Sequence, residues 1–394
     1  MLTLVWLAYA SFGITTGTIP PLAGPIIQDL GMTYSQMGLV LGGWQLVYIL
    51  TATPLGALVD RLGAKRAVAI GLVVILLSLA LRGLAVDFIT LFAAVSLFGL
   101  GGPIISIGAP KVVALWFEGK ERDWAAGIYT TAPICGMAIS LATAPSWIVQ
   151  LTGSWRGTSL VYGLVVLLVL AAWWIFARDT QEKEVASNQS QERESLPREL
   201  SALLHLRNMQ IMCIIAILTF LLNHGLNNWI PALLQEGGRT IAEAGSLTAI
   251  ATVFGAGGLL FILHLASYGK RKTVLGLLIM CSCATTAGLA FLTEEFLVAA
   301  VLLSAVVRVP LMPISTLILM ETPGIGPEKI GRAGGLFFAA AEVGGFGGPL
   351  LLGYLRDTSG SLVSGIIVLA IISGIVLLFV PLIQEKPRES DSLT

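Results

Sequence analysis

Charged residues are scarce in this sequence. Asp, Glu, Lys and Arg make up 12% of its 394 residues, whereas soluble domains carry about 25%. The formal net charge is zero, which argues against a nucleic-acid partner. There are only three histidines, and no metal-binding, nucleotide-binding or hydrolase motif is present. We therefore predict no metal, no cofactor and no enzymatic activity.

Cysteine is also rare, and long polar stretches are almost absent. Cys135, Cys213, Cys281 and Cys283 lie within apolar segments without metal-ligand spacing, so we interpret them as small core residues and predict no disulfide. The first apolar segment lacks the basic region and early cleavage site of a signal peptide, so we expect it to remain in the mature protein.

Apolar residues are abundant and occur in blocks. They form 56% of the chain, whose mean hydropathy is +0.87, and blocks of about 20 residues are long enough to cross a bilayer as helices. We predict an all-α membrane protein with twelve transmembrane helices. The expected spans are 3–28, 36–59, 67–86, 89–115, 124–149, 158–177, 209–234, 243–267, 273–292, 296–320, 333–355 and 361–383.

One long polar segment, 178–208, divides the predicted helices into two sets of six. We interpret it as a cytoplasmic linker, partly helical or disordered, between a bundle at 1–177 and a bundle at 209–383, with a tail at 384–394. The two sets resemble each other at a fixed offset, because Gly344 follows Gly136 by 208 residues at the corresponding place in the helix order. This pattern predicts two six-helix repeats.

Basic residues predict the orientation of the chain. Seventeen Lys and Arg residues fall in the connections on one side, against three on the other, Arg156, Arg239 and Arg356. Because basic loops face the cytoplasm, we expect both termini to be cytoplasmic.

The segment from Gly56 to Arg66, between the second and third predicted helices, is the most specific motif. It reads G-x-L-x-D-R-x-G-x-K-R. Gly56 would allow close helix approach, Gly63 a tight turn, and Arg61 and Arg66 would hold the loop at the membrane surface. As a simpler alternative, the segment is a solvated turn whose basic residues stop transfer.

This motif resembles the signature loop of the major facilitator superfamily. The resemblance implies that fold, with Gly56, Asp60, Arg61, Gly63 and Arg66 as a conformational latch. Asp60 would meet the positive N-terminus of the eleventh helix. The second half has no matching Asp, so the latch is expected on one side only.

A looser similarity narrows the branch. Pro110-Lys111, Asn228-Trp229 and the segment 349–353 are similar to cyanate-permease-type carriers. Such bacterial proteins move small anions or related solutes, so the resemblance implies a multi-pass protein of a bacterial or archaeal inner membrane.

Two charges lie deep in predicted helices, where an ionisable group is costly and marks a functional candidate. Arg308 is central in the tenth helix and Glu342 in the eleventh. Arg308 would bind an anionic substrate through its planar fork, and Glu342 would couple transport to protons. The alternative is a permanent salt bridge between the two.

The seventh helix carries a polar stripe, Asn223, His224, Asn227 and Asn228. Such a stripe is expected to face a cavity or another helix, and His224 is a second proton-coupling candidate. Alternatively, Asn227 and Asn228 reach the outer surface, with Trp229 marking the interface.

The remaining candidates are weaker. Trp44, Gln45 and Tyr129 are possible substrate contacts, although aromatic residues in membrane helices usually serve packing. Arg82 and Lys111 lie near predicted helix ends, so snorkelling to the surface is the expected explanation for both.

These features predict a monomeric secondary active transporter, in which two halves alternate access to one site. We expect a small organic or inorganic anion as substrate, with possible symport of protons. The alternatives are a polyspecific drug exporter, which would be expected to carry an acidic, aromatic site, and a membrane sensor that binds a solute without transporting it.

Overall fold

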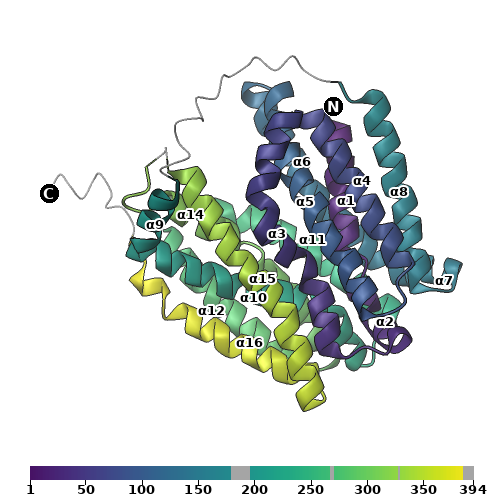
Figure 1. Ribbon diagram of the computed structural model, residues 1–394. Coiled ribbons are helices and arrows are strands. Elements are labelled where there is room, and N and C mark those ends of the chain that lie inside the picture. The colour runs from purple at the N-terminus through teal and green to yellow at the C-terminus, as the bar shows by residue number, and fades with distance from the viewer. Residues whose placement is uncertain (179–195, 267–269, 327–328, 385–394) are drawn as a thin grey trace. The chain divides into compact units, whose positions relative to one another are not determined.

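The computed structural model describes residues 1–178, 196–266, 270–326 and 329–384 (Figure 1). These residues form helices and connections, and no strand occurs among them. The α-helices are α1 (Leu2–Gly17), α2 (Ala23–Leu30), α3 (Tyr34–Leu62), α4 (Ala64–Gly83), α5 (Phe88–Trp116), α6 (Gly119–Thr143), α7 (Val149–Thr152), α8 (Trp155–Phe176), α9 (Leu196–His205), α10 (Arg207–Glu236), α11 (Ile241–Leu265), α12 (Arg271–Phe291), α13 (Glu294–Arg308), α14 (Leu311–Met320), α15 (Ile330–Ser359) and α16 (Leu362–Leu377).

The predicted membrane fold is confirmed. In the described part of the chain, eleven helical stretches are long and apolar enough to cross a bilayer, and α3 makes a twelfth if it is counted as one span. Helix α3 bends by 69° between Thr51 and Pro54. Proline lacks the N–H that would bond to the preceding turn, so the bend follows from Pro54.

Several spans that we predicted as continuous are interrupted. The first breaks between α1 and α2 at the 3-10 turn Pro20–Leu22, and the tenth breaks between α13 and α14 at Pro310. The fifth contains a π-helical turn at Ala144–Ile148, and the last ends in the 3-10 turn Val380–Leu382. Backbone carbonyls released at such breaks need partners inside the protein, and buried polar side chains near the breaks can provide them.

The helices group into two compact units. The first comprises α1 to α8 together with residues 227–253 and 349–362. The second holds α9, the first part of α10, the second half of α11 and most of α12 to α16. The first unit therefore includes parts of the predicted C-terminal bundle. The division at 1–177 and 209–383 stays a prediction. Helix α9 lies in the predicted linker 178–208, whose residues 179–195 are outside the described part, as are 385–394 of the tail.

Each unit contains the same close helix contact. In the first, where α1, α4, α5 and α6 run alongside one another (Figure 1), a Cβ added at Gly136 of α6 would meet the Ala10 carbonyl oxygen of α1. In the second, a Cβ at Gly344 of α15 would meet the Ile217 carbonyl oxygen of α10. Small residues let membrane helices approach this closely. The matched glycines found in the sequence thus make matched contacts.

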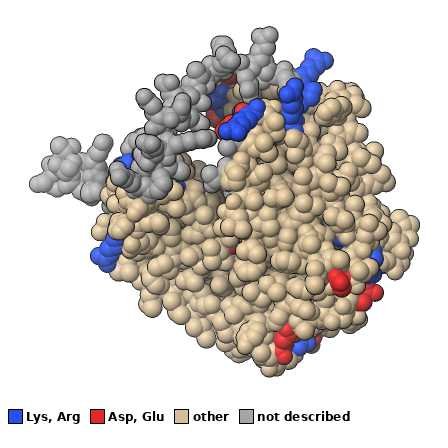
Figure 2. All heavy atoms as spheres, viewed as in Figure 1, with Lys and Arg blue, Asp and Glu red and all other residues tan. Residues whose placement is uncertain are grey.

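The surface of the first unit suits a bilayer. In Figure 2, Lys and Arg gather at the end where the chain starts, acidic and basic residues share the opposite end, and uncharged surface lies between. Large apolar side chains are exposed there, including Leu168 on α8. All four cysteines are free thiols. Cys281 is exposed, so its interpretation as a core residue was wrong, because on a membrane helix an apolar setting includes the lipid face.

Candidate functional site

Arg308 lies at the break between α13 and α14, inside the second unit. Its side chain is 1% exposed. Pro310 cannot donate a backbone hydrogen bond, so α13 ends at Arg308 and α14 starts at Leu311. The sequence correctly placed this arginine far from water, and the break explains why a polar side chain is accommodated at that depth.

Asn223 of α10 holds Arg308 in position. Arg308 Nη1 donates to the Asn223 backbone oxygen at 2.9 Å and to Oδ1 at 3.1 Å. Asn223 Nδ2 donates in return to the Arg308 backbone oxygen at 3.4 Å. The structure therefore brings two predicted site residues together. Asn223 contributes neutral oxygens, which orient the guanidinium without adding a negative charge.

Glu342 and His224 lie in the same unit. Glu342 on α15 is 7% exposed, and its Oε2 has no hydrogen-bond partner among the described residues. The hydrogen bonds described for Arg308 lead to Asn223, and whether Arg308 also pairs with Glu342 stays a prediction. His224 on α10 packs against the Phe220 ring, with centroids 5.0 Å apart.

The other two residues of the predicted polar stripe lie in the part of α10 that belongs to the first unit. Asn227 and Asn228 are half-buried and belong to the first unit. Trp229 is buried, and its Nε1 donates to the Pro349 backbone oxygen at 2.9 Å. The suggestion that Trp229 marks a membrane interface was therefore wrong, because its polar edge is satisfied inside the protein.

An aromatic cluster occupies the first unit. Phe12 of α1 contacts Trp44 of α3 and Phe98 of α5, at centroid distances of 5.7 and 5.1 Å. Tyr9 stacks on Tyr129 at 6.1 Å. Two predicted contact residues, Trp44 and Tyr129, thus pack against other rings. Gln45, the third predicted contact residue, follows Trp44 in the sequence and is fully buried.

Arg82 of α4 is a buried cation that sequence reasoning misassigned. It is 2% exposed instead of snorkelling, and its Nη1 donates to the Thr15 backbone oxygen at 2.9 Å. Thr15 lies in the last turn of α1, where helix carbonyls lack partners and the dipole favours a cation. The guanidinium also lies 5.7 Å from the centre of the Phe98 ring. The proline-rich sequence that follows α1 could have indicated that this helix ends there and that its last carbonyls need a donor from elsewhere.

The two buried arginines bind carbonyls at related positions, although the arginines themselves lie on helices that do not correspond in the repeat. Arg82 binds a carbonyl of α1, which opens the first repeat, and Arg308 binds a carbonyl of α10, which opens the second. Thr15 and Asn223 are 208 residues apart, the same offset as Gly136 and Gly344. Each unit thus uses a guanidinium to satisfy its opening helix at the same level of the repeat.

The predicted latch loop lies at the basic end of the first unit. Asp60 forms an ion pair with Lys111 at 3.3 Å, which replaces the snorkelling expected of Lys111. Gly63 has φ of +77°, so its role as a turn glycine is confirmed. A Cβ at Gly56 would meet only Ile107, at 4.0 Å, so the close helix approach predicted there is absent from the described residues.

Polar contacts at the opposite end of the first unit were not predicted. Asp357 of α15 accepts hydrogen bonds from the Tyr34 and Ser35 backbone N–H groups at 2.9 and 2.8 Å, and from the Ser35 hydroxyl. Arg356 lies over the Tyr34 ring at 4.6 Å and pairs with Glu236 of α10. Residues far apart in the sequence are thus tied together at the start of α3.

Gln235 and Gly353 reinforce this closure. Gln235 Nε2 donates to the Pro21 backbone oxygen at 3.2 Å, and a Cβ at Gly353 would meet the Tyr34 carbonyl oxygen. The contact therefore combines backbone packing with charge. It joins helices of both predicted repeats, which is the arrangement expected of a gate in a carrier that alternates access.

Known proteins resemble this chain over nearly its whole length. A sequence profile described as Major Facilitator Superfamily matches residues 5–349. The hexuronate transporter of Bacillus subtilis (strain 168) is 25% identical, over 94% of this chain and 92% of that protein. The cyanate transport protein of Escherichia coli (strain K12) is 24% identical, over 87% of this chain and 86% of that protein.

Solved structures show the same fold. A crystal structure of a mutant of the nucleoside transporter NupG has a TM-score of 0.83 at 15% identity and covers 98% of this chain and 99% of that one. At this identity the likeness concerns the fold alone.

Proposed function

This chain belongs to the major facilitator superfamily, and on that premise we propose that it transports a small anion by alternating access, with Arg308 as the anion-binding residue. The observation that carries this proposal is the guanidinium of Arg308, 1% exposed and held by neutral oxygens of Asn223. A fixed cation at this depth attracts an anion strongly, because water does not screen it.

The named relatives support an anionic substrate. Hexuronate and cyanate, which the names of two relatives give as their solutes, each carry a negative charge at neutral pH. A hexuronate joins a carboxylate to several hydroxyl groups. Arg308 matches the carboxylate, and the amide of Asn223, in the same unit, matches a hydroxyl group as donor and acceptor.

Glu342 and His224 are the groups we assign to proton coupling. A buried carboxyl whose Oε2 lacks a partner is a position where a proton can bind during the cycle. Entry of an anion beside Arg308 changes the local charge, which would favour taking up a proton with the substrate. This arrangement gives anion and proton symport.

The proposed setting follows from the charge of the loops. Because Lys and Arg predominate in the connections on one side, we place both termini in the cytoplasm of a bacterial or archaeal cell and the chain in its inner membrane. The proposed working unit is a monomer.

Ligand-dependent unfolding of the purified protein tests this assignment. Glucuronate, with its carboxylate, and glucose, without one, form a matched pair of probes. Glucuronate at about 100 times its dissociation constant is expected to stabilise the wild type by about 2.7 kcal/mol, whereas glucose has no effect. Arg308→Gln is expected to abolish the response.

Arg82→Gln is the matched control, because Arg82 is equally buried and also donates to a backbone carbonyl. This variant is expected to unfold earlier but to keep the glucuronate response. Equal stabilisation of the wild type and Arg308→Gln would contradict the role of Arg308. Failure of every small anion, with binding of lipophilic cations instead, would point to a drug exporter.

A further inference from the structure

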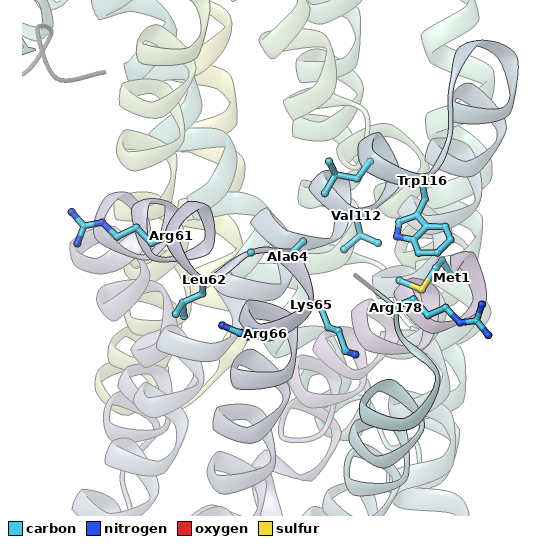
Figure 3. Close-up of a pocket in the computed structure, with 11 residues that line it drawn as sticks. Met1, Arg61, Leu62, Ala64, Lys65, Arg66, Val112, Trp116 and Arg178 are labelled. Atoms are coloured by element: carbon cyan, nitrogen blue, oxygen red, sulfur yellow. The ribbon is translucent and has the colours of Figure 1, made fainter. Parts of the chain in front are cut away.

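A basic pocket lies at the end of the first unit where the chain starts (Figure 3). It has a volume of about 230 Å³ and is lined by Arg61, Lys65, Arg66 and Arg178 together with Trp116. These residues come from the end of α3, the first turn of α4, the end of α5 and the chain after α8. Four basic residues from three segments of the chain thus line one pocket, with Lys65 and Arg178 on the same side as Trp116 and with Arg61 pointing away from them (Figure 3).

No acidic residue lines this pocket in the described part of the chain. The nearby acid Asp60 is already paired with Lys111. The side chains of Arg61, Lys65, Arg66 and Arg178 form no hydrogen bond or ion pair with described residues. The pocket therefore concentrates positive charge that an anionic ligand would balance.

An apolar groove adjoins the basic pocket and shares Arg66 with it. The groove has a volume of about 650 Å³ and runs between α4 and α8. Arg66, Ala69, Ile70 and Val73 follow the helical spacing that places them on one face of α4. Leu167, Leu170, Ala171 and Trp174 line the facing side of α8 with the same spacing.

The groove lies open at the surface of the first unit. Trp174 is 68% exposed, and Ile70, Val73 and Leu167 are exposed as well. Apart from Arg66 its lining is apolar. The groove can therefore make close contact with an acyl chain, and its apolar side chains form no hydrogen bonds with water. Trp174 and Trp116 are suited to the level of the lipid head groups.

We propose that this pocket and groove bind one anionic phospholipid, whose phosphate lies among Lys65, Arg66 and Arg178 and whose acyl chain lies between α4 and α8. A basic pocket at the membrane surface attracts anionic head groups. A groove that continues from the pocket between two membrane-spanning helices fits the acyl chain of a lipid, which a free anion lacks. This proposal does not depend on which solute is transported.

The lipid would act on the predicted latch loop. Arg61, Gly63 and Arg66 belong both to that loop and to the pocket lining. Trp173 Nε1, from α8, donates to the Lys65 backbone oxygen at 3.0 Å, so α8 already supports the start of α4. A bound phospholipid would add a second link at the same point.

Native mass spectrometry of the full chain, titrated with phosphatidylglycerol, tests the proposal. The wild type is expected to retain one phosphatidylglycerol and to bind zwitterionic phosphatidylcholine much more weakly. The double variant Lys65→Gln, Arg178→Gln is expected to bind phosphatidylglycerol about thirtyfold more weakly. This is the effect of removing two basic side chains that each attract an anionic head group with the usual strength. Lys120→Gln with Lys329→Gln removes the same charge outside the pocket and is expected to leave binding unchanged.

A second variant tests the groove without changing charge. Ala171→Trp places a large side chain at an exposed position of the groove, so the fold should tolerate it while acyl-chain binding weakens. Equal binding of the two lipids, or full retention in the Ala171→Trp variant, would overturn the proposal. Complete displacement by glycerol phosphate at concentrations similar to those of the lipid would also overturn it, since the site would then bind free phosphate.

Discussion

Asp357 offers the sharpest test of how this carrier closes. Its carboxylate accepts two backbone N–H groups at the start of α3, from Tyr34 at 2.9 Å and Ser35 at 2.8 Å. It acts as an N-cap supplied by another helix. Replacing an N-cap residue by Ala costs about 0.5–2 kcal/mol, and hydrogen bonds to a charged group lie at the upper end of the usual range.

We therefore assign the Asp357 contact about 2 kcal/mol. If these bonds exist only in the closed arrangement, Asp357→Ala shifts the equilibrium towards the open arrangement by about thirtyfold, because the whole difference falls on one state. Spin labels at Gln28 and Gly237, in a cysteine-free background, report the distance across this end by pulsed electron paramagnetic resonance. A longer distance is expected to become populated in Asp357→Ala.

Asp87→Ala is the matched control. Asp87 also caps a helix start, because its carboxylate accepts from the Thr90 N–H at 2.8 Å, but this contact is local to α5. The variant is expected to unfold earlier and to keep the wild-type distance distribution. An unchanged distribution in Asp357→Ala, or the same change in both variants, would refute the gate.

Three further predictions concern packing, buried charge and pH. Gly344→Ala is expected to destabilise the protein by about 1–3 kcal/mol, because its Cβ would meet a backbone oxygen. Gly335→Ala, where a Cβ would meet nothing within 4 Å, is expected to be neutral, and thermal unfolding in detergent compares the two. Arg82→Gln is expected to lose about 1–3 kcal/mol through its buried hydrogen bond, measured by the same method; stability equal to the wild type would contradict the cap on α1. The backbone N–H of Thr90 lowers the pKa of Asp87, so this contact stabilises the fold above the ordinary carboxyl pKa, about 3.9, and is lost as pH falls through the lower folded value. The deficit of Asp87→Ala is therefore expected at pH 7 and should vanish in strong acid; a deficit that persists there would contradict the assignment.

Much of the fold was predictable because the bilayer imposes simple requirements on a sequence. Spans of apolar residues must be helical when backbone groups cannot reach water, so length and hydropathy predicted twelve helices. The described part of the chain has eleven, or twelve if the bent α3 counts as one span. The breaks were harder to predict. The apolar pattern across residues 296–320 is continuous, so Pro310 was the one sign in the sequence that α13 stops at Arg308.

The candidate site was predictable where one residue alone was unusual. Arg308 stood out because a cation in the middle of an apolar helix has few explanations. Arg82 did not stand out, because it lies near the end of the predicted span 67–86, where snorkelling to the membrane surface would also explain it. Its burial depends on the open end of α1, and that is a tertiary contact between residues 67 positions apart.

Contacts between distant segments set the limit of sequence reasoning. Asp357 and Tyr34 are 323 positions apart, and neither helix alone shows that a carboxylate will cap the other. Gly56 illustrates the opposite error. Its place in a motif suggested close packing, whereas the structure leaves space around it.

Counterflow of labelled glucuronate in proteoliposomes tests the central claim most directly, because it requires both binding and alternating access. The wild type is expected to show saturable exchange that other small anions inhibit and glucose does not, and Arg308→Gln is expected to show none. Exchange that glucose inhibits equally well, or that Arg308→Gln retains in full, would contradict an anion carrier built around Arg308.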